Sequence, residues 1–264
     1  MMRFLNSRSP VHPLVIAAGA LLSAACSSTS PSTSTPVRLS VMAHRAVPTP
    51  ARRGLSADVA IGTGANSLNI TNVDFVLART ELSDAGTCSI PPANNDNCDE
   101  LEIDPLLIDL PLDGTPPQKV LDALVPPGTY TRLQAELNAV QPGEGETGAA
   151  AFLAAHPDWA GLSVQVTGDY TDASSTVHHF TFTSGVDAQI EIPFASPVTV
   201  DPAKPTSNIT LTVDVAKWFT DGVGAAIDPT NPANADAINA NIKSSFEAFQ
   251  DNNEDGVADQ QGAA

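Results

Sequence analysis

Apolar and polar residues alternate with a period of two along much of this chain, which is the pattern of half-buried strands. The stretches "LSVQVTGDYT" (162–171) and "VHHFTFTS" (177–184) show it clearly. Further strands are predicted at 38–44, 56–62, 68–82, 100–110, 128–141, 188–194 and 207–219. So many strands with so few helices between them predict a mainly β fold, an antiparallel β-sandwich of immunoglobulin-like or Greek-key type.

Helical spacing is confined to three stretches. Short helices are predicted at "PPQKVLDALV" (116–125) and "GAAAFLAAHP" (148–157). An amphipathic C-terminal helix is predicted over 233–250, because apolar residues there share one helical face. Those residues are Ile238, Ile242, Phe246 and Phe249.

Turn residues divide the chain into segments. "PPG" (126–128), "PGEGETG" (142–148) and "DPAKPTS" (201–207) separate predicted strands. We therefore expect a sandwich domain over 37–219, formed either as one sandwich or as two with a break near 142–160. Residues 220–264 then hold the helix and an acidic tail.

Composition and charge narrow the functional classes. Hydrophobic residues make up 42% of the 264 residues, which is ample for a packed core. All 30 acidic residues follow residue 53, together with only six of the 12 basic residues. The main body would therefore repel phosphate, and a nucleic-acid partner is not expected.

The N-terminus reads as an export signal over residues 1–25. Arg3 and Arg8 precede the apolar run "LVIAAGALLSAAC", which ends at Cys26. The segment "LSAAC" resembles a bacterial lipoprotein signal, although Ser23 stands where that family usually has Leu. The resemblance implies a lipid on Cys26, a membrane anchor and, because Ser27 follows, sorting to the outer membrane. Ordinary cleavage after Ala25 without a lipid is the alternative.

Two further features fit an exported protein. Residues 26–36 are rich in Ser, Thr and Pro and are expected to form a flexible tether. Cys88 and Cys98 then remain for a disulfide, which would close the loop "CSIPPANNDNC". A metal site formed by the same two cysteines is the competing hypothesis, but it lacks short C-x-x-C spacing and a nearby His.

The segments "VDFVLARTEL", "LLIDL" and "LVPPGTYTRLQAEL" resemble exported β-sandwich domains of unknown function in bacterial lipoproteins. That resemblance would cover residues 37–141. It implies a sandwich fold and no defined activity.

The sharpest chemical pattern is "DNNEDGVAD" near the C-terminus. Asp251, Asn253 and Asp255 occupy alternate positions before Gly256, with the Val257 carbonyl and Asp259 next in the series. Calcium prefers six to eight oxygen ligands, and this spacing resembles the calcium loops of EF-hand, dockerin and thrombospondin type 3 repeats. The twelfth position is Gly262 rather than Glu, so Asp221, Asp228 or another carboxylate would have to complete the site. An acidic end without a ligand is the alternative.

Other candidate sites are less specific. His178 could bind a transition metal in the periplasm, but His179 beside it should point to the opposite face of the strand. Carboxylates that could pair as glycosidase acid and base are Asp169, Asp172, Asp187 and Glu191. No nucleophile elbow, phosphate loop or zinc-protease motif occurs in the sequence. The leading hypothesis is therefore a non-catalytic envelope lipoprotein that binds or scaffolds, with metal handling and glycan cleavage as alternatives.

Overall fold

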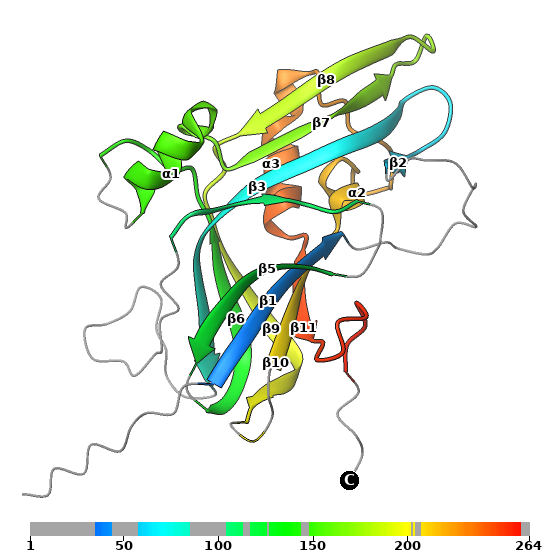
Figure 1. The fold of residues 1–264 in the computed structure, drawn as a ribbon. Helices are drawn as coiled ribbons and strands as arrows, with labels where there is room; N and C mark the ends of the chain where they lie inside the picture. The colour runs from blue at the N-terminus through cyan, green and yellow to red at the C-terminus, as the bar shows by residue number, and fades with distance from the viewer. Residues whose placement is uncertain are drawn as a thin grey trace, which may run out of the picture. The chain divides into compact units, whose positions relative to one another are not determined.

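Two β-sheets form the body of the protein in the computed structural model (Figure 1). The structure describes residues 35–43, 58–84, 104–112, 117–125, 127–143, 148–201, 203 and 207–259. Residues 33–264 form one compact unit. The predicted signal, Cys26, Cys88 and Cys98 lie outside the described residues.

The four-strand sheet has the order β11-β10-β1-β5. Its strands are β1 (Thr35–Ala43), β5 (Gln118–Val125), β10 (Ser207–Val213) and β11 (Phe246–Gln250). β1 runs parallel to β10, whereas β5 and β11 pair antiparallel with their neighbours. The predicted antiparallel arrangement is therefore wrong for the β1–β10 pair. The parallel pairing is possible because 163 residues of chain, from 44 to 206, connect the two strands.

The seven-strand sheet has the order β8-β7-β3-β6-β9, and all its pairs are antiparallel. Its long strands are β3 (Ser67–Asp84), β6 (Gly128–Leu137), β7 (Val164–Thr171), β8 (Val177–Ser184) and β9 (Ala188–Val200). Two short strands, β2 (Val59–Ile61) and β4 (Leu106–Asp109), pair with β3.

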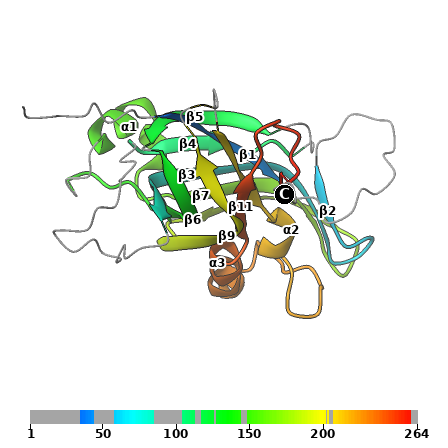
Figure 2. The same cartoon turned by 90° about the horizontal axis from the view of Figure 1, so that it is seen from below.

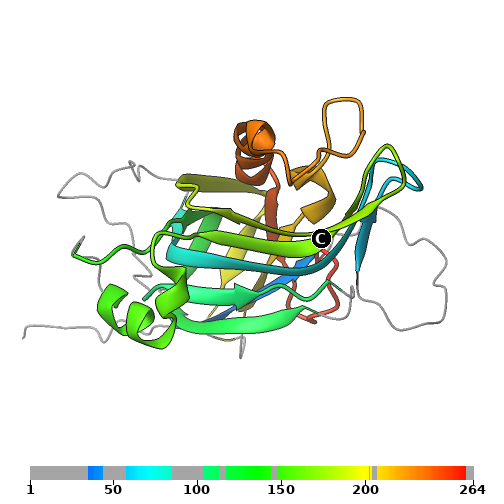
Figure 3. The same ribbon diagram turned by 90° about the horizontal axis from the view of Figure 1, so that it is seen from above.

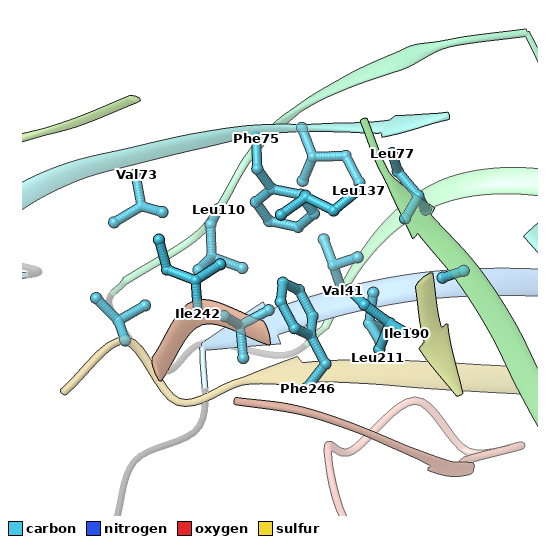
Figure 4. Close-up of a cluster of buried hydrophobic side chains, with 14 of the residues drawn as sticks. Val41, Val73, Phe75, Leu77, Leu110, Leu137, Ile190, Leu211, Ile242 and Phe246 are labelled. Atoms are coloured by element: carbon cyan, nitrogen blue, oxygen red, sulfur yellow. The ribbon is translucent and has the colours of Figure 1, made fainter. Parts of the chain in front are cut away.

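The main core lies between the two sheets, as the sequence predicts for a sandwich. Phe75, Leu137 and Ile190 from the seven-strand sheet face Val41, Leu211 and Phe246 from the four-strand sheet (Figure 4). The Phe75 and Phe246 rings meet edge to face with their centroids 5.9 Å apart. Burial of these side chains is what makes the alternating pattern stabilising, because each contributes about 1.5 to 3 kcal/mol of transfer free energy.

Helices extend the core where the smaller sheet does not reach. The segment containing α2 (Val215–Trp218), η2 (Pro232–Asn234) and α3 (Ala235–Lys243) lies on one side of the β7–β8 hairpin (Figure 3). Phe219 packs against Phe180 and Phe182 of β8 with ring centroids 6.2 and 5.8 Å apart. Trp218 and Phe219 are fully buried, so both aromatics belong to the core.

A smaller cluster occupies the other side of the seven-strand sheet. It joins Val76 and Val140 to Phe152 of α1 (Ala149–Ala155) and Trp159 of η1 (Pro157–Trp159). α1 and α3 therefore lie on opposite sides of this sheet (Figure 2). The helix predicted at 148–157 is present as α1 and η1.

Three predicted elements differ from the structure. The segment 116–125 forms β5 instead of a helix, because it pairs with β1 along its length. The strand predicted over 207–219 ends at Val213, where Asp214 caps α2 by accepting a hydrogen bond from Lys217 N at 3.1 Å. The helix predicted over 233–250 ends at Lys243 and is followed by β11.

Ser245 explains why α3 ends at Lys243 and β11 follows. Its backbone oxygen accepts a hydrogen bond from Asp214 N, and its hydroxyl bonds to Ile242 O and Trp218 Nε1. These contacts turn the chain out of α3 and into β11. Phe246 then reaches the core from a strand, where the helical spacing had placed it on α3.

Candidate calcium loop

The tail loop, residues 251–259, continues directly from β11 and folds back beside β10 and β11 (Figure 1). Backbone bonds close it at both ends, since Asp251 N donates to Asn208 O and Asp259 N donates to Gln250 O. The Asp259 carboxylate also accepts from Asn252 N at 2.8 Å. The tail is thus an ordered loop attached to the sandwich.

Asp251 is the buried centre of the loop, with none of its surface exposed. Its Oδ1 accepts from Asp255 N at 3.0 Å, and its Oδ2 accepts from Gly256 N at 3.0 Å. The Thr210 hydroxyl of β10 donates to the same Oδ2 at 2.9 Å. A buried carboxylate needs such donors, because burial without them would cost several kcal/mol.

Asn253 and Asp255, the ligand candidates at positions three and five, lie on the turn that follows Asp251. Asp255 Oδ1 accepts from Val257 N at 2.8 Å, and Asp255 Oδ2 accepts from the Asn253 amide at 2.9 Å. Gly256 adopts a positive φ of 78°, which gives the sharp turn expected at the sixth position of a calcium loop. The side chains at positions one, three and five therefore lie on one tight turn.

Besides Thr210, two strand residues that no sequence motif marks, Asn208 and Ser40, hold the loop in place. Asn208 Nδ2 donates to Asp251 O at 2.8 Å, and Asn208 N donates to the Asn252 side chain at 3.1 Å. Ser40 of β1 donates to Asn208 Oδ1 at 2.9 Å. The row Asn208, Thr210 and Thr212 in "SNITLTV" could have suggested this role, because these polar residues share one face of β10.

An ion pair links the loop to β1, and through it to β5 at the opposite edge of the four-strand sheet. Arg38 of β1 pairs with Glu254, and it also contacts Asp122 of β5. The Glu254 carboxylate raises the pKa of Arg38, and the Lys119 ammonium lowers the pKa of Asp122. Both pairs are open to solvent, so their contribution to stability is small.

Asp221 and Asp228, the carboxylates considered as further calcium ligands, accept hydrogen bonds from residues of their own loops. Asp221 accepts from Val223 N and Ala225 N, and Asp228 accepts from Thr230. Across the described ranges, no group of three or more His, Cys, Asp or Glu side chains is close enough to hold a metal ion. Calcium binding would therefore require the tail carboxylates to draw closer together.

The two adjacent histidines contact different aspartates. His178 Nε2 lies 2.9 Å from Asp172 Oδ2, and His179 Nδ1 lies 3.2 Å from Asp169 Oδ1. The Ser174 hydroxyl is the main cause, and His178 the next, of a pKa for Asp172 far below its usual value. This carboxylate closes the turn between β7 and β8, because it also accepts from Thr176 N.

The carboxylates considered for glycan cleavage are dispersed. Glu191 of β9 pairs with Arg132 of β6 at 2.7 Å. Asp169 lies on β7, and β3 and β6 separate β7 from β9 in the sheet. The register separates them further, because Asp169 pairs with Asn69 of β3 whereas Glu191 lies level with Glu81, 12 residues further along β3 or roughly 40 Å at about 3.3 Å per residue. Glycosidase carboxyl groups lie within about 10 Å of each other, so Asp169 and Glu191 do not form such a pair. Asp172 is occupied by the hairpin turn, and Asp187 is exposed before β9.

Comparisons with known proteins add one distant similarity. No protein-family model matches the chain, and no curated protein sequence matches it. Among solved structures, MbnP from Methylosinus trichosporium is similar with a TM-score of 0.41 and 14% sequence identity, over 82% of this chain and 98% of that one. A similarity this low transfers no property to the present chain. No helix within the described ranges is long and apolar enough to cross a membrane.

Proposed function

We propose that this protein is an exported, non-catalytic β-sandwich module of the cell envelope, anchored through a lipid on Cys26, whose tail loop binds calcium. The observation that carries the calcium proposal is the fully buried Asp251, whose carboxylate organises the loop through the amides of Asp255 and Gly256. Oxygen ligands from Asp251, Asn253, Asp255 and Asp259, with the Val257 carbonyl, suit a hard cation such as calcium.

Calcium would act as a clasp between the tail loop and the four-strand sheet. Asp251 contacts Thr210, and its backbone contacts Asn208, so an ion that fixes the loop also fixes the end of β11 against β10. Without a bidentate Glu at position twelve, we expect affinity in the range of extracellular modules, roughly 10⁻⁴ to 10⁻³ M. Such a site would be filled outside the cell and empty at cytosolic calcium levels.

Thermal melts with calcium and with chelator test the clasp. At calcium about tenfold above the dissociation constant, stabilisation of ~1.4 kcal/mol should raise the melting temperature by about 3 to 6 °C. Asp255→Asn should abolish that shift, because it removes one ligand charge yet keeps an acceptor for Val257 N. The double variant Asp251→Ala with Asp255→Ala should also fail to respond.

Asp221→Asn is the matched control. Asp221 closes a similar exposed loop by accepting from two backbone amides, so its substitution should leave the calcium shift intact. A wild-type melting temperature that does not move, or a shift that survives in Asp255→Asn, would remove calcium binding from the proposal. Fatty-acid labelling of the chain and of a Cys26→Ser variant tests the anchor separately.

A further inference from the structure

β8 is an unprotected edge of the seven-strand sheet. Among the described strands, only β7 pairs with it, and Figure 1 shows no strand on its other side. Its eight residues, "VHHFTFTS", contain no Pro, Gly, Asp, Glu, Lys or Arg. Thr181 and Thr183 are exposed, and the exposed fraction of Val177 is 62%. An edge of this kind readily accepts another strand.

The other long edges carry the features that prevent such pairing. β5 exposes Lys119 and Asp122, and β9 contains Pro193, Pro197 and Glu191. β11 has only five residues and includes Glu247. Charges, prolines and short length all discourage edge-to-edge association. The absence of every such feature on β8 alone, in a chain with 30 acidic residues, sets this strand apart.

We propose that β8 pairs antiparallel with β8 of a second copy of this chain, around a two-fold axis at Thr181. A second copy fits because it offers the same neutral edge, whereas acidic surface elsewhere on two copies would repel. An antiparallel strand pair is self-complementary, and a two-fold arrangement uses both edges, so association stops at a dimer. The seven-strand sheets then join into one continuous sheet.

Side chains across the axis are compatible in this register. Thr181 lies opposite Thr181 of the second copy, His179 opposite Thr183, and Phe180 opposite Phe182, with residues on the same face throughout. His179 already contacts Asp169 of its own β7, and His178 contacts Asp172. No carboxylate of β8 meets another, because the strand contains none.

Sedimentation of the purified chain over a range of concentrations tests the pairing. We expect a monomer–dimer equilibrium, and Thr181→Lys should raise the dimer dissociation constant by about tenfold, because two lysines then meet at the axis. Thr199→Lys is the matched control: Thr199 is an exposed threonine on β9, and its substitution should leave the equilibrium unchanged. Both variants should melt as the wild type does.

A crosslink provides a measurement that does not depend on charge. Thr181→Cys should form a dimer under mild oxidation, since directly opposed strand residues have Cα atoms about 4.5 to 5.5 Å apart, within the range of a disulfide, whereas Thr199→Cys and the wild type should not. A wild type that stays monomeric at all concentrations would overturn the proposal. So would equal effects of the two lysine substitutions, open-ended assemblies, or a stable complex in which a different protein occupies β8.

Discussion

A few polar side chains in the described part of this protein are buried without the hydrogen bonds or opposite charges that would compensate for the loss of water. Thr80 of β3 is 2% exposed, and its hydroxyl is buried with no hydrogen-bond partner among the described residues. It borders a small, partly open pocket of about 20 Å³ that is lined mostly by apolar side chains, including Leu82, Leu133 and Ile209. A hydroxyl in such a place costs stability, because it has lost its water and gained nothing.

We therefore expect Thr80→Val to stabilise the protein by about 1 to 2 kcal/mol, measured by denaturant unfolding. Thr210→Val is the matched control, since that hydroxyl is also buried but donates to Asp251. It should lose about 2 kcal/mol, as hydrogen bonds to charged groups are worth more. Equal effects of the two substitutions would mean that the Thr80 hydroxyl is satisfied in solution.

A second unfavourable feature is the close approach of two carboxylates. Asp74 of β3 lies directly opposite Asp109 of β4, with Asn72 and Gln165 as its polar neighbours. Partial burial, and next the Asp109 charge, raise the pKa of Asp74. A raised carboxyl pKa favours the folded state only while the group is protonated, so stability falls as pH rises through the ordinary Asp range toward the raised value.

Asp74→Asn should therefore stabilise the protein at neutral pH by some tenths to about 1 kcal/mol. The amide oxygen keeps an acceptor for the Asn72 side chain, which donates to Asp74 at 2.6 Å. The gain should disappear at pH values below the ordinary pKa of Asp, where the wild-type carboxyl is neutral. A gain that is independent of pH, in unfolding curves measured at several pH values, would contradict this assignment.

The candidate calcium ligands could be predicted because they lie close together in the sequence. Asp251, Asn253 and Asp255 have the spacing of a known loop, and the structure places them on one turn around Gly256. The polar row of β10 is visible in the sequence, but the contact of Thr210 and Asn208 with Asp251 could not be predicted, because it forms only once β11 has paired with β10. Their role depends on a contact across about 40 residues.

Among elements, strands were predicted well where one face is buried and the other exposed. β8 has the predicted bounds, 177–184, since its alternation follows from Phe180 and Phe182 facing the core. β5 was predicted as a helix because "QKVLDALV" contains good helix formers, but pairing with β1 outweighs that propensity. The local sequence of β5 does not show that β1 will pair with it, and this pairing decides between strand and helix.

β3 and β7 depend on a close backbone approach at Gly168. It pairs with Ile70 next to a register shift, and a Cβ there would collide with Asn69 O and lie 3.0 Å from Ile70 Cα. Gly168→Ala should therefore destabilise the protein by about 1 to 3 kcal/mol in thermal or denaturant unfolding. Gly222→Ala, where no atom lies within 4 Å of the added carbon, should be nearly neutral. A neutral Gly168→Ala would show that the two strands can separate there without cost.

At the scale of the whole molecule, the sandwich core carries the α2–α3 segment and the tail loop. Local sequence patterns predict these two parts only incompletely. The two-layer core was predicted from period-two alternation together with the many strands and few helices, since a half-buried sheet requires a second layer. The parallel β1–β10 pair and the return of the chain from α3 into β11 were not, because both depend on the order in which distant segments meet. The tail loop forms on the platform that these strands provide.

Hydrogen–deuterium exchange of the tail loop, with calcium and with chelator, tests the central claim most directly. The amides of Asp255, Gly256 and Val257 already bond to loop carboxylates, so calcium should slow their exchange further by fixing those acceptors. Peptides covering 251–259 should gain protection, while those covering 221–225 should not change. Exchange in 251–259 that is the same with and without calcium would contradict the claim that this loop is a calcium clasp on the sandwich.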